Sequence, residues 1–421
     1  MKKIIREYYL RILKKSLKNK KICFLVGARQ VGKTTLLKQF TKNLKNYAFL
    51  SCDEIGLKNF ESTTDFLNYF SVTKGVNFEK ITYLILDEVQ VINNISIFLK
   101  DLHDNYNFKI FASGSGSLEI FKGISDSLIG RKEILKIYPF SFFEFLQAKN
   151  TKIINCKNLT PSVIQIYENF FEEYLLFGGY PEVVMSQTKK EKIKNLLSIY
   201  QSYIEKDLRE YILTKDLFAF EKFYKLISGS ICSLQKIDKI CKEINVHRDK
   251  IEKFSFILKN TFIIDLIPPF VEKINKEVHS HKKIYFSDIG FINSVLESFF
   301  VSADKKGKLI ENFILNEIKK FISMHQLLQI FKVYFWRKKS QTEVDFVIKN
   351  LEKNKLIPIE VKSKSTDVIP KSFDSFYDFY GDRVDFFVVF NKNIFKTRKL
   401  HDKKVLFLPH FCVDGIFEER N

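Results

Sequence analysis

The eight residues from Gly27 to Thr34 read GARQVGKT and separate an apolar run from a helical segment. In that setting the pattern is typical of a P-loop, whose main-chain N–H groups bind phosphate oxygens. Gly27 and Gly32 let the main chain curl, Lys33 is expected to reach the β- and γ-phosphates, and Thr34 to bind Mg²⁺. The loop therefore predicts an ATP site formed by Gly27, Ala28, Arg29, Gln30, Val31, Gly32, Lys33, Thr34 and Thr35.

Two acids, Asp87 and Glu88, follow the apolar run Tyr83–Leu86. A carboxylate at the carboxyl end of a buried parallel strand lies where the ligand crevice of such a sheet opens. We expect Asp87 to hold Mg²⁺, mostly through water, and Glu88 to orient or polarise the attacking water.

Ser113 and Arg131 are two further candidates for the same site. Ser113 ends the next apolar run and could sense the γ-phosphate, although a Ser/Gly turn is the alternative interpretation. Arg131 could act as an arginine finger, either within the chain or toward a neighbouring subunit. Taken alone, the sequence around Arg131 favours a surface salt bridge.

A second set of candidate residues lies near the C-terminus, in the segments TEVDFVI and IPIEVKSK. Strand alternation places Glu343 and Asp345 on one face, and Glu360 and Lys362 on one face of the neighbouring strand. Glu311 lies on an amphipathic helix that precedes them. Carboxylates without thiols or imidazoles suit a hard cation such as Mg²⁺. Cross-strand salt bridges are the alternative, but buried polar groups are costly without partners, which favours the metal site.

The hydrophobic pattern divides the chain into four parts. Residues 1–140 alternate continuous apolar strands with helices, which indicates a parallel sheet covered on both faces. Residues 141–190 are predicted as a helical lid, 191–275 as a helical segment, and 280–421 as a mixed α/β domain. The predicted fold class is therefore α/β, with a P-loop domain at the N-terminus and a second mixed domain at the C-terminus.

Within the middle segment, residues 235–243 and 247–258 read as two helices joined by a short turn, followed by a β-like stretch. This order is typical of a winged helix-turn-helix, whose second helix could enter a DNA major groove. The exposed side chains would then be those of His247, Arg248, Lys250 and Lys253. The alternative is a unit that packs domains together and keeps these charges solvated.

Composition restricts the partners and the compartment. A net charge of +20 over 421 residues favours an anionic partner, nucleic acid or a lipid surface, or else a Lys-rich solvated surface. Six scattered cysteines without a CxxC pair argue against a disulfide framework and for a reducing cytoplasm. No stretch of 18 apolar residues occurs, so no transmembrane segment is expected. The basic, amphipathic N-terminus is expected to form a helix packed on the ATPase core, with a membrane surface as the alternative.

The motifs GARQVGKTT, LILDEVQ, SGSGSLEI, SLIGR, YPFSFFEFL and LFGGYPEVV, in this order, resemble those of AAA+-type ATPases of bacteria and archaea. Those ATPases carry a C-terminal domain formerly described as of unknown function. The resemblance implies that Ser113 is the sensor position and Arg131 the candidate finger. Ala28 departs from the usual Pro, and Gly116 stands where Ser is common, which leaves the role of that position open.

The spacing E-x-D followed by E-x-K resembles the PD-(D/E)XK nuclease-like fold. That resemblance implies that Asp345 and Glu360 bind Mg²⁺, that Glu311 completes the coordination, and that Lys362 positions the attacking water. Two functions follow. One is a Mg²⁺-dependent ATPase that controls a DNA-directed module with a nuclease site. The other is an ATP-switched DNA-binding regulator whose nuclease-like domain is inert. Self-association is compatible with both.

Overall fold

The computed structural model describes residues 4–53, 60, 62–92, 95–115, 128–208, 211–272, 281–338 and 342–418. The chain divides into two compact units. The first comprises residues 1–139, 201–211 and 256–263, and the second comprises residues 140–200, 212–255 and 264–421.

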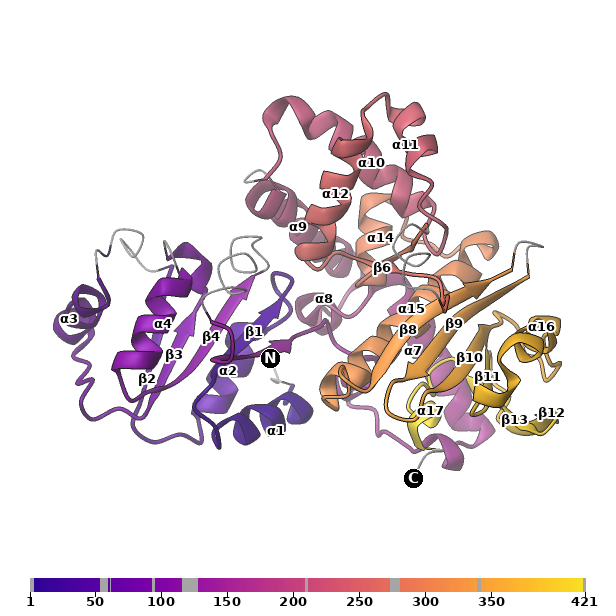
Figure 1. Ribbon diagram of the computed structural model, residues 1–421, viewed down its shortest axis with the longest axis horizontal. Coiled ribbons are helices and arrows are strands. Elements are labelled where there is room, and N and C mark those ends of the chain that lie inside the picture. The colour runs from indigo at the N-terminus through magenta and orange to yellow at the C-terminus, as the bar shows by residue number, and fades with distance from the viewer. Residues whose placement is uncertain are drawn as a thin grey trace. The chain divides into compact units, whose positions relative to one another are not determined.

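A five-stranded parallel sheet forms the centre of the first unit. Its strands are β1 (Ile22–Gly27), β2 (Tyr47–Ser51), β3 (Tyr83–Asp87), β4 (Lys109–Ser115) and β5 (Lys132–Lys136). They lie in the order β2-β3-β4-β1-β5 (Figure 1). Every residue of β1 and β4 is buried, as expected for central strands with both faces covered. The parallel sheet predicted from the apolar runs is confirmed.

The helices of this sheet are α1 (Glu7–Ser16), α2 (Lys33–Thr41), α3 (Thr63–Lys74) and α4 (Ile95–Asn105), with a short 3₁₀ turn at Val89–Val91. Helix α1 buries Tyr9 and Leu13 completely. The side-chain amide of Gln39 in α2 donates to the Ile4 carbonyl at 2.7 Å. The basic N-terminal segment is thus a helix packed on the core of this unit, as predicted.

The middle of the chain is helical. Its elements are α6 (Phe142–Ala148), a 3₁₀ turn at Cys156–Asn158, α7 (Pro161–Phe177), α8 (Pro181–Met185), α9 (Lys189–Tyr203), a π turn at Ile204–Leu208, a 3₁₀ turn at Thr214–Asp216, α10 (Leu217–Gly229), α11 (Ile237–Ile244) and α12 (Arg248–Asn260). Helix α11 ends where Asn245 adopts a left-handed conformation. Strands β6 (Ile264–Ile267) and β7 (Lys283–Phe286) then pair antiparallel. The helix–turn–helix and β order matches the prediction, and its assignment as a winged helix stays a prediction.

A six-stranded mixed sheet forms the C-terminal part of the second unit, in the order β12-β13-β11-β10-β9-β8. Its strands are β8 (Phe331–Arg337), β9 (Glu343–Asn350), β10 (Lys355–Val361), β11 (Phe387–Asn391), β12 (Lys396–Leu400) and β13 (Lys403–Pro409). The accompanying helices are α14 (Ile289–Val295), α15 (Ala303–Met324), α16 (Lys371–Tyr380), a 3₁₀ turn at Gly381–Arg383 and α17 (Gly415–Glu418). Strands β8, β9 and β10 pair antiparallel, whereas β10, β11 and β13 pair parallel.

The segment predicted as a helical lid packs on this C-terminal domain. The Phe142 N–H donates to Glu317 of α15 at 3.0 Å, and Lys320 of α15 donates to the Phe140 carbonyl at 3.0 Å. At the other end of the segment, the Gly179 N–H donates to Asp288 at 2.7 Å. A Cβ atom on Gly178 would collide with the Asp288 carboxylate. The motifs YPFSFFEFL and FGGYPEV are therefore packing motifs of the second unit.

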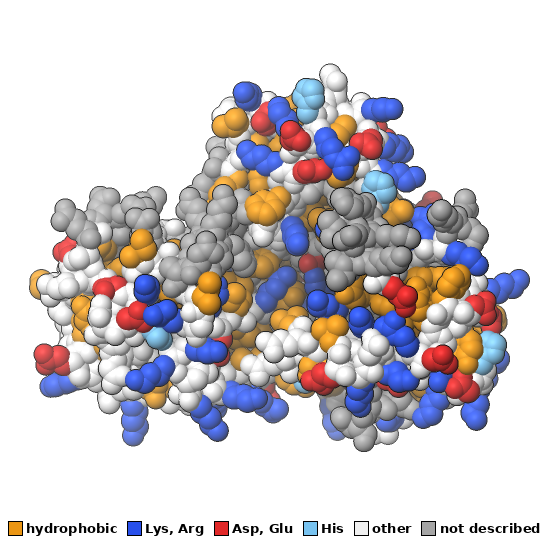
Figure 2. Space-filling view, viewed as in Figure 1, with side chains coloured by type: hydrophobic (Ala, Val, Ile, Leu, Met, Phe, Trp, Pro, Cys, Tyr) orange, Lys and Arg blue, Asp and Glu red, His pale blue; other side chains and the backbone are white. Residues whose placement is uncertain are grey.

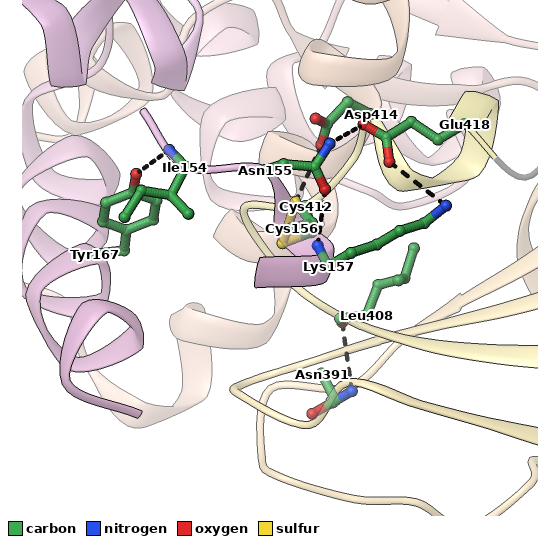
Figure 3. Close-up of a disulfide and its surroundings, with 10 residues drawn as sticks. All are labelled: Ile154, Asn155, Cys156, Lys157, Tyr167, Asn391, Leu408, Cys412, Asp414 and Glu418. Carbon is green, nitrogen blue, oxygen red and sulfur yellow. Dashed lines mark hydrogen bonds and ion pairs between the residues drawn. A yellow bond between two sulfur atoms is a disulfide. The ribbon is translucent and has the colours of Figure 1, made fainter. Parts of the chain in front are cut away.

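A disulfide bond joins Cys156 to Cys412, with Cα atoms 5.8 Å apart (Figure 3). Around it, Asn155 and Lys157 contact Glu418 of α17 at 2.7 and 4.0 Å. The scattered cysteines argued against a disulfide framework, whereas the structure joins this one pair. The two cysteines are 256 residues apart, so only the folded chain brings them together, and the argument for a reducing compartment loses its basis. Among the described helices, none has the length and apolar composition of a membrane span.

Candidate functional site

The P-loop lies between β1 and α2, as its sequence predicts. Gly32 adopts a left-handed conformation with φ 93° at the start of α2, and a Cβ atom on Gly27 would collide with the Ile137 carbonyl oxygen. Lys33 is only 4% exposed. Its ammonium donates to the carbonyl oxygens of Gly27 and Ala28 at 3.1 and 2.9 Å. The loop therefore holds the lysine over its own main chain, where it is available to a phosphate.

Asp87 ends β3 and meets the P-loop as predicted. The Ser113 hydroxyl donates to the Asp87 carboxylate, and the Glu88 N–H donates to the same hydroxyl oxygen at 3.2 Å. Burial raises the pKa of Asp87, while hydrogen bonds from Ser113 and Thr34 and the charge of Lys33 oppose the rise. Asp87, Thr34, Lys33 and Ser113 are thus brought together at one end of the sheet.

Glu88 is held by two side chains that were not predicted. Its backbone is left-handed, with φ 56°, an unfavourable conformation for a residue with a side chain. Its carboxylate accepts hydrogen bonds from Gln90 at 2.5 Å and from Ser115 at 3.2 Å. Gln90 also donates to Ser115 at 3.1 Å. The sequence carried a signal for Ser115, because it lies two residues after Ser113 on the same strand.

The residues present fit a nucleotide with its metal ion. The Thr34 hydroxyl and the Asp87 carboxylate are hard oxygen donors within reach of each other, which is the donor type that Mg²⁺ requires. Main-chain N–H groups at the start of α2 and the Lys33 ammonium supply the positive charge for phosphate. Thr34 and Asp87 would hold the metal ion, as predicted from the sequence.

Arg6 is a further residue that the sequence did not single out. Its guanidinium donates to the Val31 carbonyl of the P-loop at 3.2 Å and lies 4.4 Å from the centre of the Tyr9 ring. The residue is 4% exposed. Arg6, the residue directly before α1, therefore supports the P-loop with a buried cation that lies outside the motif.

Arg131 does not reach this site within the chain. Its carbonyl accepts the Ile22 N–H at 2.7 Å, so it lies beside the first residue of β1, whereas the P-loop follows the last. Five residue steps of a strand cover roughly 16 Å. Its side chain pairs with Asp104 at 2.8 Å, and this pairing lowers the pKa of Asp104 to about 2. The salt-bridge interpretation is confirmed. The finger within the chain is not, because Arg131 lies beside the start of β1 and the P-loop follows its end.

Two of the four side chains proposed to contact DNA already have partners. Arg248 pairs with Glu252 at 2.8 Å and Asp238 at 3.3 Å, and Lys250 pairs with Asp216 at 2.5 Å. His247 and Lys253 are exposed. Figure 2 shows Lys and Arg side chains spread across the face in view, with Asp and Glu among them.

The C-terminal acids lie close together, but an unpredicted cation lies among them. Lys283 of β7 pairs with Glu311 of α15 at 3.3 Å and with Glu343 of β9. The Tyr285 hydroxyl donates to Glu311 at 2.7 Å. Burial lowers the pKa of Lys283, but the carboxylates of Glu311, Asp345 and Glu343 outweigh burial and raise it. Lys283 is therefore a charged member of this cluster.

The remaining acids also have donors. Asp345 accepts the Val361 N–H at 2.8 Å, and Glu360 accepts from Lys362 at 2.8 Å and from Ser372. In the part of the chain that the structure describes, no group of three or more acidic, His or Cys side chains is arranged to hold a metal ion. The predicted set of Glu311, Asp345 and Glu360 does not converge on one point. Gly116, whose role was left open, lies outside the described residues.

Comparison with known proteins defines the class of the first domain. Residues 19–146 match a family model described as an AAA domain. With the P-loop, Asp87 and Glu88 in their expected places, this region is a P-loop ATPase domain that supports ATP binding. Residues 168–300 and 306–411 match two models, each described as a domain of unknown function (DUF8612 and DUF4143).

Similar whole chains come from archaea and bacteria. An uncharacterized protein of Methanocaldococcus jannaschii is 29% identical over 78% of this chain and 72% of its own length. An uncharacterized protein of Haemophilus influenzae is 28% identical over 62% of this chain and 65% of its own. Among solved structures, the Walker-type ATPase of Pyrococcus abyssi covers 70% of this chain and 96% of its own, with 17% identity and a TM-score of 0.45.

Proposed function

We propose that this protein is a Mg²⁺-dependent ATPase whose nucleotide state acts on a DNA-directed helical module. The observation that best supports ATPase activity is that Asp87 and Glu88 have different hydrogen-bonding partners. Asp87 is buried and bonded to Thr34 and Ser113, while the Glu88 carboxylate accepts hydrogen bonds from Gln90 and Ser115.

These contacts suggest a division of work. Bound Mg²⁺ would neutralise charge on the phosphates, and Asp87 and Thr34 would hold it. Lys33 exchanges its carbonyl partners for phosphate oxygens, because charge-assisted bonds to phosphate are stronger than those to neutral carbonyls. Glu88 accepts a proton from the attacking water, and Gln90 and Ser115 fix the orientation of its carboxylate. Ser113 links the acids, so a change at the γ-phosphate is passed to both.

The Glu88→Gln variant tests this assignment. It removes the base and keeps the phosphate cradle, so ATP binding should stay near wild type while turnover falls roughly 100-fold or more. Steady-state phosphate release and binding of a fluorescent ATP analogue measure the two quantities. Glu79→Gln, an exposed acid in the same unit, is the matched control. Turnover of Glu88→Gln at the wild-type rate would exclude Glu88 as the base.

The DNA-directed part rests on the helix–turn–helix order of α11 and α12, the β6–β7 pair that follows, and the net charge of +20. His247 and Lys253, two of the four side chains named from the sequence, are exposed and are candidates for phosphate contact. Lys253→Ala should weaken DNA binding and lower the slope of log affinity against log salt by about one. Fluorescence anisotropy over a salt series measures both, with and without ATP. An unchanged slope would remove Lys253 from the interface, and salt-independent binding would remove the electrostatic interpretation.

The second unit also supports a nuclease-like fold for residues 280–421. Helix α15 precedes three antiparallel strands, β8 to β10, and helix α16 then leads to β11, which pairs parallel with β10. The E-x-D and E-x-K segments lie on β9 and at the end of β10, as the resemblance implies. This order supports the fold only, because the acids are not arranged around one metal position.

A further inference from the structure

Lys283 occupies the centre of the C-terminal acid cluster. Its side chain is 4% exposed and pairs with both Glu311 and Glu343. The Phe335 ring centre lies 5.4 Å from its ammonium. The residue is fixed by the sheet, since β7 pairs with β6 and Lys283 also forms a bridge with Leu234. The ammonium is therefore a buried, positionally fixed part of the cluster and does not belong to a mobile surface side chain.

The acids around Lys283 do not offer a coordination shell. Mg²⁺ and Mn²⁺ need several oxygens at about 2.0–2.2 Å from one point. Glu311 is engaged by Lys283 and Tyr285, and Asp345 by the Val361 N–H. A divalent ion bound by Glu311 or Glu343 would stand within a few ångströms of the ammonium, where like charges in a buried site repel strongly. The carboxylates around Lys283 therefore do not fit the divalent metal ion that the resemblance implies.

We propose that Lys283 is the resident cation of this cluster and takes the position that a divalent ion would need, so that the C-terminal domain has no metal-dependent nuclease activity. Each buried carboxylate of the cluster has a charged or hydrogen-bonding partner without a metal ion. Burial and the carboxylates of Glu311 and Glu360 nevertheless raise the pKa of Asp345 well above its usual range. Removing the ammonium would leave Glu311 without its cation, while Glu343 would keep Arg337 at 3.8 Å. It would thereby create the divalent site that the wild-type chain lacks.

Solvent reaches the cluster, which makes the proposal testable. Lys283 and Glu343 line a cavity of about 650 Å³ together with Arg337 of β8 and Lys236 and Lys239 near the start of α11. A small ion in this cavity would reach Lys283 and Glu343 without unfolding of the domain. Metal binding can therefore be measured on the folded protein, and it depends on the net charge of the side chains around Lys283.

The experiment is a Mn²⁺ titration of the full chain without nucleotide. The concentration of free Mn²⁺ is measured at each step by electron paramagnetic resonance. Wild type and Glu311→Gln should give the same isotherm. Lys283→Met should gain one Mn²⁺ per chain that the wild type does not bind. Lys283→Met combined with Glu311→Gln should lose that ion again, and Lys283→Arg should gain none. Asp87→Asn identifies any ion bound at the ATPase domain.

Three results would overturn the proposal. In the first, Glu311→Gln or Asp345→Asn binds one Mn²⁺ ion fewer than the wild type. In the second, Lys283→Met is folded but gains no ion. Wild type could also cut plasmid DNA with Mg²⁺ in a reaction that Asp345→Asn abolishes. Circular dichroism and ATP binding establish whether Lys283→Met is folded. If it is not, the comparison of wild type with Glu311→Gln and Asp345→Asn decides alone, since it needs no lysine variant.

Discussion

At the scale of single residues, the two acids of the ATP site differ in what surrounds them. Burial raises the pKa of Asp87, while hydrogen bonds from Ser113 and Thr34 and the charge of Lys33 oppose the rise. The Glu88 carboxylate accepts hydrogen bonds from Gln90 and Ser115. The motif pattern predicted Asp87, Glu88 and Ser113 because each ends an apolar strand. It could not predict Gln90, whose role depends on the turn that Glu88 makes.

His410 gives a pH dependence that belongs to one residue. Burial lowers its pKa to about 4, against 6.5 normally, and its Nε2 donates to the Lys362 carbonyl at 2.8 Å. Between these values the unfolded chain binds a proton that the folded chain does not, so stability falls as pH decreases. Between pH 7.5 and pH 5 the loss should be about 2 kcal/mol.

His410→Gln should remove that part of the pH dependence and keep an N–H donor for the Lys362 carbonyl. Urea unfolding of wild type and variant at the two pH values gives the difference in free energy. Other groups titrate in the same range, among them Asp414, whose pKa burial raises to about 6. They act in both proteins and cancel in the comparison. Equal pH dependence in the two proteins would show that His410 has the same pKa in the folded and the unfolded chain.

At the scale of elements, the sequence predicted the parallel sheet and the P-loop because continuous apolar strands and the GKT pattern are local signals. It also predicted the N-terminal helix from its amphipathic pattern. It did not predict the contacts that cross elements. Arg6 meets Val31 from a separate helix, Lys283 meets Glu311 from another strand, and Cys156 meets Cys412 across 256 residues. No spacing rule in the sequence carries these contacts.

The support that α1 gives to the P-loop is testable on that helix alone. Arg6→Met keeps the apolar stem and removes the charged hydrogen bond to Val31, which is worth about 1.5 kcal/mol or more. ATP affinity should fall roughly tenfold, as measured with a fluorescent analogue. Arg11→Met changes an arginine of the same helix whose side chain is 74% exposed, and it should have little effect. Equal losses in both variants would attribute the effect to the charge of α1 rather than to this contact.

At the scale of the whole molecule, the structure forms two compact units, and the four predicted domain bounds stay a prediction. Residues 140–200 group with the C-terminal sheet, because YPFSFFEFL and FGGYPEV bond to α15 and to Asp288. The sequence separated these motifs from the C-terminal domain, since their partners lie more than 100 residues away.

The central claim is that the curled loop from Gly27 to Thr34, with Lys33 behind it, binds ATP with Mg²⁺. Isothermal titration of the full chain with ATP and Mg²⁺ tests it most directly, alongside Lys33→Ala and the exposed control Lys45→Ala. The wild type and the control should bind one ATP per chain with similar affinity, and Lys33→Ala, folded by circular dichroism, should bind at least roughly 100-fold more weakly. Wild-type affinity in Lys33→Ala, or no ATP binding by the wild type, would contradict it.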